Sequence, residues 1–448
     1  MIRDITNALR YIGFLLIYLT PGIGFGQAFP TAAGDTEKKD TLSENIDFSF
    51  SLPEQYRLDP DTIEFLVEYG DSALDLGIDV SPPACAGRAN DWKRGYLHPS
   101  CLYRTTGLGV NAGDSVLRGD TLDIVGGDYR WEYWLVASQF DSCRKYSAED
   151  NILACSHDGR HWERPYYVTV AGDTIRCPEP LYESRQFPGG GHLSDPCIEI
   201  DESGKLALLF RQNFTRRDIN VARWWLTRSE NGIYWDVDDT IRVMDDTVCL
   251  KGGAFMYLSP TLIYTGHETG KYEIYFVHDT SDCRQKPNAI LRLAVDDLYR
   301  REAWGHGQYE TCRYVARQAG SNPWHIDIIR ISDTEYRALV TEHHVGTNST
   351  YLGEGLTFAV SHDGGLSFKA SPDYIILPKQ AVDSSNWDRR YIYRSSGIPA
   401  IIGGNPGYLI YYSVYGGWRG KGTENRYRLG RARVLFHHRP DSIPGNPD

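Results

Sequence analysis

Short apolar and aromatic runs alternate with clusters of Gly, Asp, Asn and Pro along most of the chain after about residue 86. Runs of this length, rich in Tyr, Ile, Val and Leu and bounded by turn residues, predict β-strands. Clear examples are Tyr133–Ala137, Leu206–Phe210, Tyr272–Val277, Arg337–Thr341 and Tyr408–Tyr412. The pattern therefore predicts an all-β fold.

Similar opening phrases precede five of these runs. The phrases start at His98, Asp195, Ser259, His325 and Ser395, with gaps of 97, 64, 66 and 70 residues. The long first gap holds a Gly- and Asp-rich insertion around residues 107–128. Five units of about four strands predict a five-bladed β-propeller, with a β-sandwich or two separate β domains as alternatives. In a propeller the opening phrases would be the innermost strands, and their first residues would gather at one mouth of the central channel.

A second repeat is a turn motif. Ser156–Trp162 recurs as Ser229–Trp235 and, one residue longer, as Ser361–Phe368. In each copy we expect the Asp or Asn side chain to hydrogen-bond its own backbone, a Gly to take a positive φ, and the final aromatic ring to pack under the turn.

One helix is expected, near the N-terminal end. Asp59 can cap it, Pro60 fits its first turn, and apolar residues follow at helical spacing up to Leu66. We therefore expect residues 28–85 to form a linker with a short helix, residues 86–436 to form the propeller, and residues 437–448 to form a tail.

The first 27 residues resemble an export signal. Arg3 and Arg10 precede an apolar run from Tyr11 to Phe25, and small residues follow. A short membrane anchor is the alternative, but the run is short and contains Pro21 and Gly22. We expect a secreted or periplasmic protein whose mature chain is not inserted in a membrane. Export permits disulfides, although the nine cysteines leave at least one thiol over, and buried thiols at Cys101 and Cys197 are an equal alternative.

Composition and charge narrow the partners. The formal net charge of −12 argues against nucleic acid or an anionic membrane surface, because both attract a basic face. Aromatic residues make up 12% of the chain, including 30 Tyr, which suits both strands and surfaces that stack on sugars.

Two features resemble known families. The Ser–x–Asp–Gly–x–x–Trp turns resemble the Asp-boxes of sialidase-like propellers. The phrase from Asp195 to Phe210 resembles a blade opening of the five-bladed glycoside hydrolases of the arabinanase/xylosidase and invertase-like superfamily. The resemblance covers about residues 90–435. It implies a glycoside hydrolase that cleaves an oligo- or polysaccharide by acid/base catalysis at the propeller mouth.

The chain departs from that superfamily at two positions. Where the family places the Asp that acts as general base, this chain has His98. Where the family places the Glu that acts as general acid, it has Ser259. The family carboxylate that tunes the pKa of the acid is present as Asp195. The usual acid and base therefore do not carry over.

Five residues are the catalytic candidates. They are Asp195, Asp327, His325, Glu149 and His98. Glycoside hydrolysis normally needs two carboxyl groups, one of them protonated near neutral pH, and imidazole also titrates near that pH. The structural alternatives are a cap on backbone amides for Asp195, a salt bridge to a neighbouring blade for Asp327, core histidines for His98 and His325, and a surface carboxylate for Glu149.

Five further residues are candidates for substrate binding. They are Arg211, Trp324, His192, Arg104 and Arg330. Arginines that converge with Arg394 would suit an acidic sugar, whereas charge balance for the mouth carboxylates is the simpler interpretation. Trp324 would either stack against the sugar or pack between blades. For His192, which lies in a Gly-rich loop, an exposed position is the alternative to a binding role.

Two rival functions remain open at this point. One is a carbohydrate-binding propeller without catalysis, and the other is a lyase for acidic polysaccharides. No cofactor is required by any motif, no metal-ligand spacing stands out, and a structural calcium ion in the central channel is an option that the sequence leaves open.

Overall fold

The computed structural model describes residues 46–47, 58–70, 74, 76, 95–140, 149–216, 219–250, 256–279, 288–305, 309–344, 355–377, 391–415 and 427–438. Within these ranges the chain is almost entirely β-strand, and its helical segments are two short 3₁₀ turns, Ser184–Gln186 and Arg301–Trp304. No helix within them is both long enough and apolar enough to cross a membrane. The expected export signal, residues 1–27, lies outside the described residues.

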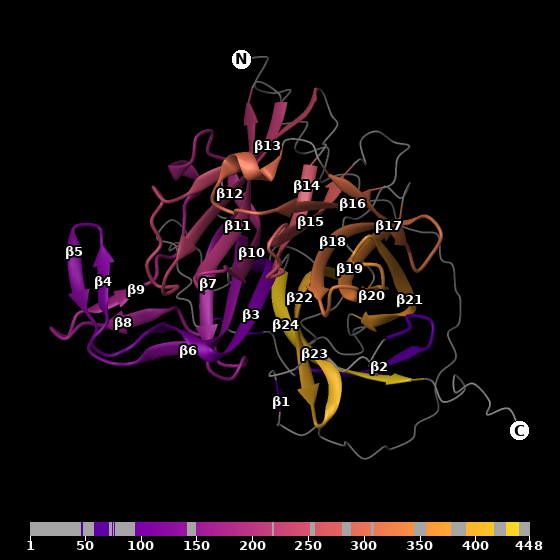
Figure 1. Cartoon of the computed structure of the whole chain (residues 1–448), viewed down its shortest axis with the longest axis horizontal. Helices are drawn as coiled ribbons and strands as arrows, with labels where there is room; N and C mark the ends of the chain where they lie inside the picture. The colour runs from indigo at the N-terminus through magenta and orange to yellow at the C-terminus, as the bar shows by residue number, and fades with distance from the viewer. Residues whose placement is uncertain are drawn as a thin grey trace, which may run out of the picture. The chain divides into compact units, whose positions relative to one another are not determined.

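The strands form five consecutive antiparallel sets, which we call blades (Figure 1). Blade 1 contains β3 (Gly95–Val110), β6 (Tyr129–Phe140) and β7 (Glu149–Ser156). Blade 2 contains β10 (His192–Ile200), β11 (Leu206–Arg216), β12 (Ile219–Ser229) and β13 (Ile241–Leu250). Blade 3 contains β14 (Met256–Tyr264), β15 (Tyr272–Asp279), β16 (Ala289–Val295) and β17 (Glu310–Val315). Blade 4 contains β18 (Ser321–Arg330), β19 (Tyr336–His344), β20 (Leu356–Ser361) and β21 (Ser367–Ile376). Blade 5 contains β22 (Tyr391–Ile402), β23 (Asn405–Tyr415), β24 (Tyr427–His438) and β2 (Ile63–Tyr69), with β1 (Ile46–Asp47) paired to β22.

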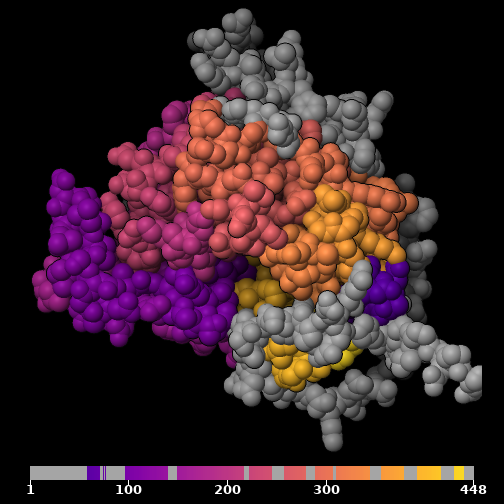
Figure 2. Space-filling view, viewed as in Figure 1, coloured from indigo at the N-terminus to yellow at the C-terminus, as the bar shows by residue number. Residues whose placement is uncertain are grey.

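The first strands of the blades form a closed ring. β3 contacts β10, β10 contacts β14, β14 contacts β18, β18 contacts β22, and β22 contacts β3. In Figure 2 the surface colours accordingly pass from indigo through magenta to orange as the chain proceeds from blade to blade. This order of strands is that of a five-bladed β-propeller, and the five opening phrases are its inner strands, as expected.

The prediction of an N-terminal helix is wrong. Ile63–Tyr69 is strand β2, which pairs antiparallel with β24 from Ile63 opposite His438 to Tyr69 opposite Ala432. Asp59 does cap a segment, but the segment is a turn, in which its Oδ1 accepts the N–H of Asp61. The apolar residues of β2 alternate with Glu64 and Glu68 at a period of two, which suits a strand that is buried on one face.

The expected boundaries change accordingly. Residues 63–69 are the outer strand of blade 5 and not part of an N-terminal extension, because the last blade takes this strand from the start of the chain. At the other end, β24 continues to His438, two residues into the expected tail. The two ends of the propeller chain therefore meet in one sheet.

Two hairpins stand outside the blades, one between β3 and β6 of blade 1 and one between blade 1 and blade 2. β4 (Ser115–Arg118) pairs with β5 (Thr121–Ile124), and β8 (Tyr166–Val168) pairs with β9 (Thr174–Arg176). Figure 1 shows them together at the left of the view. The first hairpin lies in the Gly- and Asp-rich stretch where an insertion was expected.

The three turn motifs have the hydrogen bonds that the sequence predicts. In the first copy, Asp158 Oδ1 accepts the N–H groups of Arg160 and His161, both at 2.8 Å. The φ of Gly159 is +67°, and the Trp162 ring is buried. Asn231 and Asp363 accept the corresponding backbone groups in the other two copies.

Side chains of the inner strands link each blade to the next, and we call these five hydrogen bonds the interblade ring. Ser100 Oγ accepts from Ile198 N–H (3.1 Å), Cys197 Sγ from Leu262 (3.2 Å), Thr261 Oγ1 from Ile328 (3.3 Å), Asp327 Oδ2 from Gly397 (2.9 Å) and Ser396 Oγ from Cys101 (3.1 Å). The five acceptors occupy one level of the channel, so the same position in each blade performs the same structural task.

Five cysteines whose side chains are described form no disulfide. They are Cys101, Cys155, Cys177, Cys197 and Cys312. Cys101 and Cys197 are therefore free thiols, and the sulfur of Cys197 is one of the acceptors of the interblade ring.

Candidate active site

Five residues lie two positions before the acceptors of the interblade ring, and we call them the axial ring. They are His98, Asp195, Ser259, His325 and Arg394. Each lies at or next to a register shift between the inner strand and its neighbour. The fifth member is therefore Arg394 and not Ser395, with which the fifth phrase was expected to start.

The backbone holds three of these residues in an uncommon conformation. His98, Asp195 and Ser259 have φ values of 50°, 49° and 51°, and each precedes a proline. A left-handed φ is rare for residues other than glycine and costs free energy, so it persists only where the surrounding structure enforces it. Here the bulged inner strands enforce it in three neighbouring blades, and the side chains meet at the axis.

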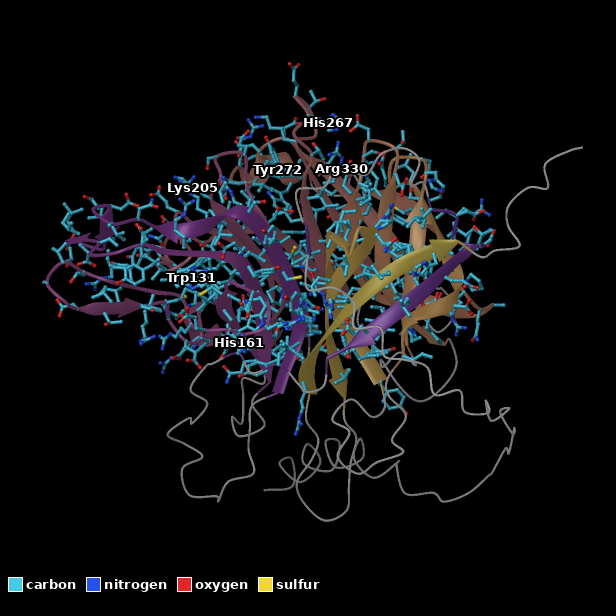
Figure 3. The ribbon with its side chains drawn as sticks, turned by 90° about the horizontal axis from the view of Figure 1, so that it is seen from below. Trp131, His161, Lys205, His267, Tyr272 and Arg330 are labelled. Carbon is cyan, nitrogen blue, oxygen red and sulfur yellow. The ribbon has the colours of Figure 1, made fainter. Side chains whose placement is uncertain are left out.

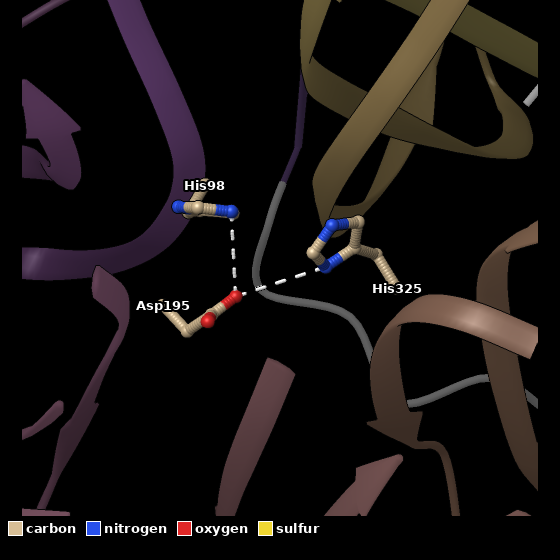
Figure 4. A group of neighbouring side chains, drawn as sticks. All are labelled: His98, Asp195 and His325. Atoms are coloured by element: carbon tan, nitrogen blue, oxygen red, sulfur yellow. Dashed lines mark ion pairs between the residues drawn. The ribbon is translucent and has the colours of Figure 1, made fainter. Parts of the chain in front are cut away.

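The carboxylate of Asp195 is the centre of the axial ring, and it has no exposed surface. Its Oδ1 lies 3.5 Å from His98 Nε2, 3.7 Å from His325 Nδ1 and 3.6 Å from Arg394 Nη1. Figure 4 shows the two imidazoles on either side of this carboxylate. His325 Nδ1 is also in close contact with Ser259 Oγ, so every member of the ring takes part in one cluster.

Arg211 neutralises Asp195 from the adjacent strand. Its Nη2 lies 2.7 Å from Asp195 Oδ2, and its Nε and Nη2 donate to Ser194 Oγ at 3.2 and 3.0 Å. The register of β10 and β11 places Arg211 directly opposite Ser194. The sequence suggested Arg211 as a substrate contact, and the structure makes it the ion-pair partner of the central carboxylate.

Glu149 approaches the same cluster from blade 1. Its Oε2 lies 3.9 Å from His98 Nδ1, which also lies 3.3 Å from Ser138 Oγ. The side chain of Glu149 is 15% exposed, so it is the more accessible of the two carboxyl groups. Glu149 and Asp195 thus lie beside opposite nitrogens of one imidazole.

The environments of these two carboxyl groups shift their pKa values in opposite directions. Burial, and after it the charge of Asp195, raises the pKa of Glu149 to about 8. Burial alone would also raise the pKa of Asp195, but Arg211 and the other cationic groups around it hold that pKa well below its usual range. At neutral pH Glu149 is therefore protonated and Asp195 is ionised.

Both histidines of the axial ring are neutral at pH 7. Burial lowers the pKa of His98 to about 3 and that of His325 well below its usual value. The charges that keep Asp195 ionised at this pH are consequently the guanidinium groups of Arg211 and Arg394.

Tyr393 is a site residue that the sequence did not indicate. Its half-buried ring lies 5.2 Å from the ring of His98 and 4.4 Å from that of His325, centroid to centroid. The one available signal was its place directly before Arg394 in the fifth inner strand. Among 30 tyrosines this position does not distinguish Tyr393 from the others.

Asp327 does not join the cluster around Asp195. It faces the channel one level further along β18, where it is the fourth acceptor of the interblade ring. Burial raises its pKa to about 6. Its four counterparts in this ring are two serines, a cysteine and a threonine, so Asp327 has the same structural task as these side chains, and its catalytic role stays a prediction.

Two of the suggested binding residues lie close to the axial ring. Trp324 is buried and makes T-shaped contacts with His325 and His343, with centroids 5.7 and 5.4 Å apart, so its ring packs inside the protein and is not open to a sugar. His192 is half-buried beside Asn213, whose amide donates to Ser194 Oγ at 3.2 Å. His192 therefore borders the site through Ser194.

Arg104 and Arg330 lie far along their inner strands from the axial ring. Arg104 donates to the carbonyl oxygen of Gly204 at 3.1 Å, in the turn that follows β10. Arg330 pairs with Asp333 at the end of β18, and Figure 3 shows it along one edge with His267 and Lys205. Neither guanidinium group reaches the axial ring.

His98, Asp195 and His325 also offer three atoms that lie within 4.8 Å of one another and could hold a metal ion. Two imidazoles and one carboxylate suit zinc-like ions and not the calcium ion considered from the sequence, which prefers six or more oxygens. The guanidinium groups oppose any such ion. The guanidinium groups of Arg211 and Arg394 lie 2.7 and 3.6 Å from the oxygens of Asp195, so they would repel a cation and already neutralise the one carboxylate that would bind it.

No family model and no curated protein matches the chain. Among solved structures it is similar to Zg3597, a family 117 glycoside hydrolase of the marine bacterium Zobellia galactanivorans (13% identity, 84% of this chain and 91% of that chain, TM-score 0.43). It is also similar to a thermostable family-43 glycoside hydrolase (11%, 79% and 97%, TM-score 0.46) and to an endo-arabinase from Bacteroides thetaiotaomicron (11%, 75% and 93%, TM-score 0.39). At these identities and TM-scores the similarity carries no argument about the activity of this chain.

Proposed function

We propose that this chain is a glycan-active propeller that hydrolyses a glycosidic bond, with Glu149 as general acid and Asp195 as general base. The observation that carries the proposal is the pair of carboxyl groups beside opposite nitrogens of His98, one protonated and one ionised at neutral pH. Opposite protonation of two neighbouring carboxyl groups is what acid/base hydrolysis of a glycoside requires.

In the proposed reaction Glu149 gives its proton to the leaving glycosidic oxygen, which departs with the electron pair of the broken C–O bond. Asp195 takes a proton from the water molecule that attacks the anomeric carbon. The placement of both groups around one imidazole limits their separation to the order of 10 Å, the scale on which inverting glycosidases separate their carboxyl groups (~6.5–9.5 Å).

Unsatisfied polar atoms in the site support a polyhydroxylated ligand. Among the described residues, buried atoms without a hydrogen-bond partner include Nε2 of both axial histidines, Oδ1 of Asp195, Nε and Nη1 of Arg394, and Oε2 of Glu149. Such atoms are costly unless a ligand or water satisfies them. They include donors and acceptors, and a sugar hydroxyl group can serve both.

A carbohydrate-binding propeller without catalysis is the second candidate. The complete burial of Asp195 and its ion pair with Arg211 favour it, because a general base has to reach a water molecule. For either function we place the protein outside the cytoplasm, on the export pattern of residues 1–27, and expect oligo- or polysaccharides as ligands.

Product release from a panel of neutral and acidic polysaccharides tests the proposal. Reducing ends and near-UV absorbance are read together, since unsaturated products would indicate a lyase. We expect Asp195→Asn and Glu149→Gln to lose about 10²-fold or more of the activity. Asp327→Asn is the matched control, because it changes a buried carboxylate outside the cluster around Asp195.

Three outcomes contradict the hydrolase. Equal loss in all three variants would indicate a general defect, UV-absorbing products would establish elimination, and retention of glycans without any product would favour the binding propeller.

A further inference from the structure

We propose that His98 couples the protonation of the two carboxyl groups: as the Nε2–H tautomer, its imidazole accepts a hydrogen bond from protonated Glu149 at Nδ1 and donates one to ionised Asp195 at Nε2. His98 is thus a positioning residue for the acid and the base together. The use of this coupling in catalysis rests on the proposed function, whereas the contacts of His98 and the experiment that tests them do not depend on it.

Unpaired atoms mark the path of this coupling. Oε2 of Glu149, Nε2 of His98 and Oδ1 of Asp195 are all buried without a hydrogen-bond partner. They lie on the two contacts that flank the imidazole, at 3.9 and 3.5 Å. Both distances exceed a hydrogen bond by less than about 1 Å, and catalytic hydrogen bonds commonly tighten when substrate binds.

Donor and acceptor chemistry then determines the tautomer. An ionised carboxylate only accepts hydrogen bonds, so the nitrogen that faces Asp195 has to carry the hydrogen. A neutral imidazole has one hydrogen, so Nδ1 is left as an acceptor. Two groups can donate to it, the hydroxyl of Ser138 at 3.3 Å and the protonated carboxyl of Glu149. Ionisation of Glu149 would remove that donor, so the ring favours a protonated Glu149 whenever Asp195 is ionised.

The surroundings of His98 hold its ring in place. Its backbone has a φ of 50° at a bulge before Pro99. The rings of His325 and Tyr393 lie 5.1 and 5.2 Å from its own, centroid to centroid. A ring fixed in this way keeps each nitrogen on its own carboxyl group.

Other charged and titratable groups also face His98, and each comes from a different part of the fold. Arg211 from β11 and Arg394 from β22 oppose a positive charge on its ring, as does His192 from β10 when protonated. His325 from β18 is neutral at pH 7. Asp195 favours the charged ring, but burial outweighs it, so His98 stays neutral over the pH range in which Glu149 titrates.

Two variants of His98 separate coupling from simple packing. The amide of Asn lies where Nδ1 lies and can accept from Glu149, whereas the amide of Gln extends to the position of Nε2 and reaches Asp195. Coupling predicts that His98→Asn keeps the high titration midpoint of Glu149, near pH 8, and that His98→Gln lowers it by about one pH unit or more. If His98 only excludes water, the order reverses, because Gln fills the space better than Asn.

The midpoint is measured without substrate. The infrared C=O band of the protonated Glu149 carboxyl group, assigned by its loss in Glu149→Gln, is followed from pH 5 to pH 10 in the full chain. A second measurement covers the case in which a variant does not fold. In the wild-type protein labelled with ¹⁵N-histidine, NMR reports the tautomer of His98, and we expect a neutral ring with hydrogen on Nε2.

Each of these results supports or refutes the proposed role of His98. An Nδ1–H tautomer, or equal midpoints in the Asn and Gln variants, would overturn the coupling while leaving hydrolysis open. A failure of all polysaccharides to react would remove the proposed function, yet these two readouts would still establish or refute the role of His98.

Discussion

Asp195 and Glu149 are the same kind of group, and their surroundings alone distinguish them. Asp195 has two guanidinium groups within 3.6 Å of its oxygens, whereas Glu149 has a neutral imidazole at 3.9 Å and the negative charge of Asp195 nearby. An opposite charge favours the ionised form, and burial or a like charge favours the protonated one. The chemistry of each residue is therefore a property of its neighbours.

Glu149 makes the stability of the protein depend on pH. Its pKa rises from 4.5 to about 8 on folding, so between these values the folded state holds a proton that the unfolded state has released. Stability should fall as the pH rises through this window, by about 5 kcal/mol at most. Gln imitates the protonated form, so Glu149→Gln should have a Tm close to that of the wild type at pH 5 and a higher Tm at pH 9. Circular dichroism melts check this, and an equal difference at both pH values would contradict it.

Asp327 should behave as a structural acceptor. Asp327→Asn keeps an oxygen for the N–H of Gly397 and removes the cost of a buried charge, so we expect its stability at pH 7 to equal or exceed that of the wild type. Asp327→Ala leaves that N–H unsatisfied and should cost about 1–3 kcal/mol. Urea denaturation measures both. A stable Asp327→Asn variant that has lost all activity would return Asp327 to the catalytic group.

At the scale of the element, β2 shows how one stretch of sequence supports two interpretations. Asp59 and Pro60 form a starting signal that serves a turn as well as a helix. The partner strand β24 lies more than 360 residues away in the chain, so no local pattern reveals it. Hydrogen bonding to that partner decides the conformation.

The strand assignment of β2 has a direct test. Ile63 is 1% exposed in the core of blade 5, whereas Leu66 is 49% exposed. A helix would place these residues, three apart, on one face, but a strand places them on opposite faces. Ile63→Ala should therefore cost about 2–5 kcal/mol and Leu66→Ala less than about 0.5 kcal/mol. Similar losses in a denaturant titration would argue for the helix.

At the scale of the whole propeller, the interblade ring links all five blades at the channel, including blades 3 and 4, which are also joined at their outer edges by the parallel pairing of β17 with β21. Every inner strand gives one side-chain acceptor and receives one in return. The axial ring lies two residues away on the same strands, so the links between blades also hold the catalytic candidates at fixed separations.

Removing one link should weaken the whole propeller. Thr261→Val keeps the shape of the side chain but leaves the N–H of Ile328 without its acceptor, and we expect a loss of about 1–3 kcal/mol. Thr261→Ser keeps the hydroxyl group and is the control. Unfolding in urea, followed by tryptophan fluorescence, compares them, and equal stability of the two variants would show that this link is dispensable.

The sequence by itself determined the features that depend on local patterns. Short apolar and aromatic runs between clusters of turn residues identified the strands, the spacing of the opening phrases identified the inner strand of each blade, and the turn chemistry was correct in all three copies. These features follow from residues close together in the chain, for which side-chain period and backbone preference are sufficient.

The tertiary structure alone decided which candidates act together. Glu149, on the third strand of blade 1, lies beside His98, and Arg394 lies in the cluster around Asp195 where Asp327 was expected. Tyr393 lies beside the two histidines, and β2 pairs with β24 in blade 5. The physical reason is that these contacts join residues far apart in the chain, either on different strands of one blade, as for Glu149 and His98 or β2 and β24, or on different blades, as for Arg394 and Asp195, so they form only when the strands pair and the ring of blades closes. The same closure removes Glu149 and Asp195 from bulk water, and that burial, together with the charges beside each group, sets the opposite protonation states on which the proposed chemistry depends.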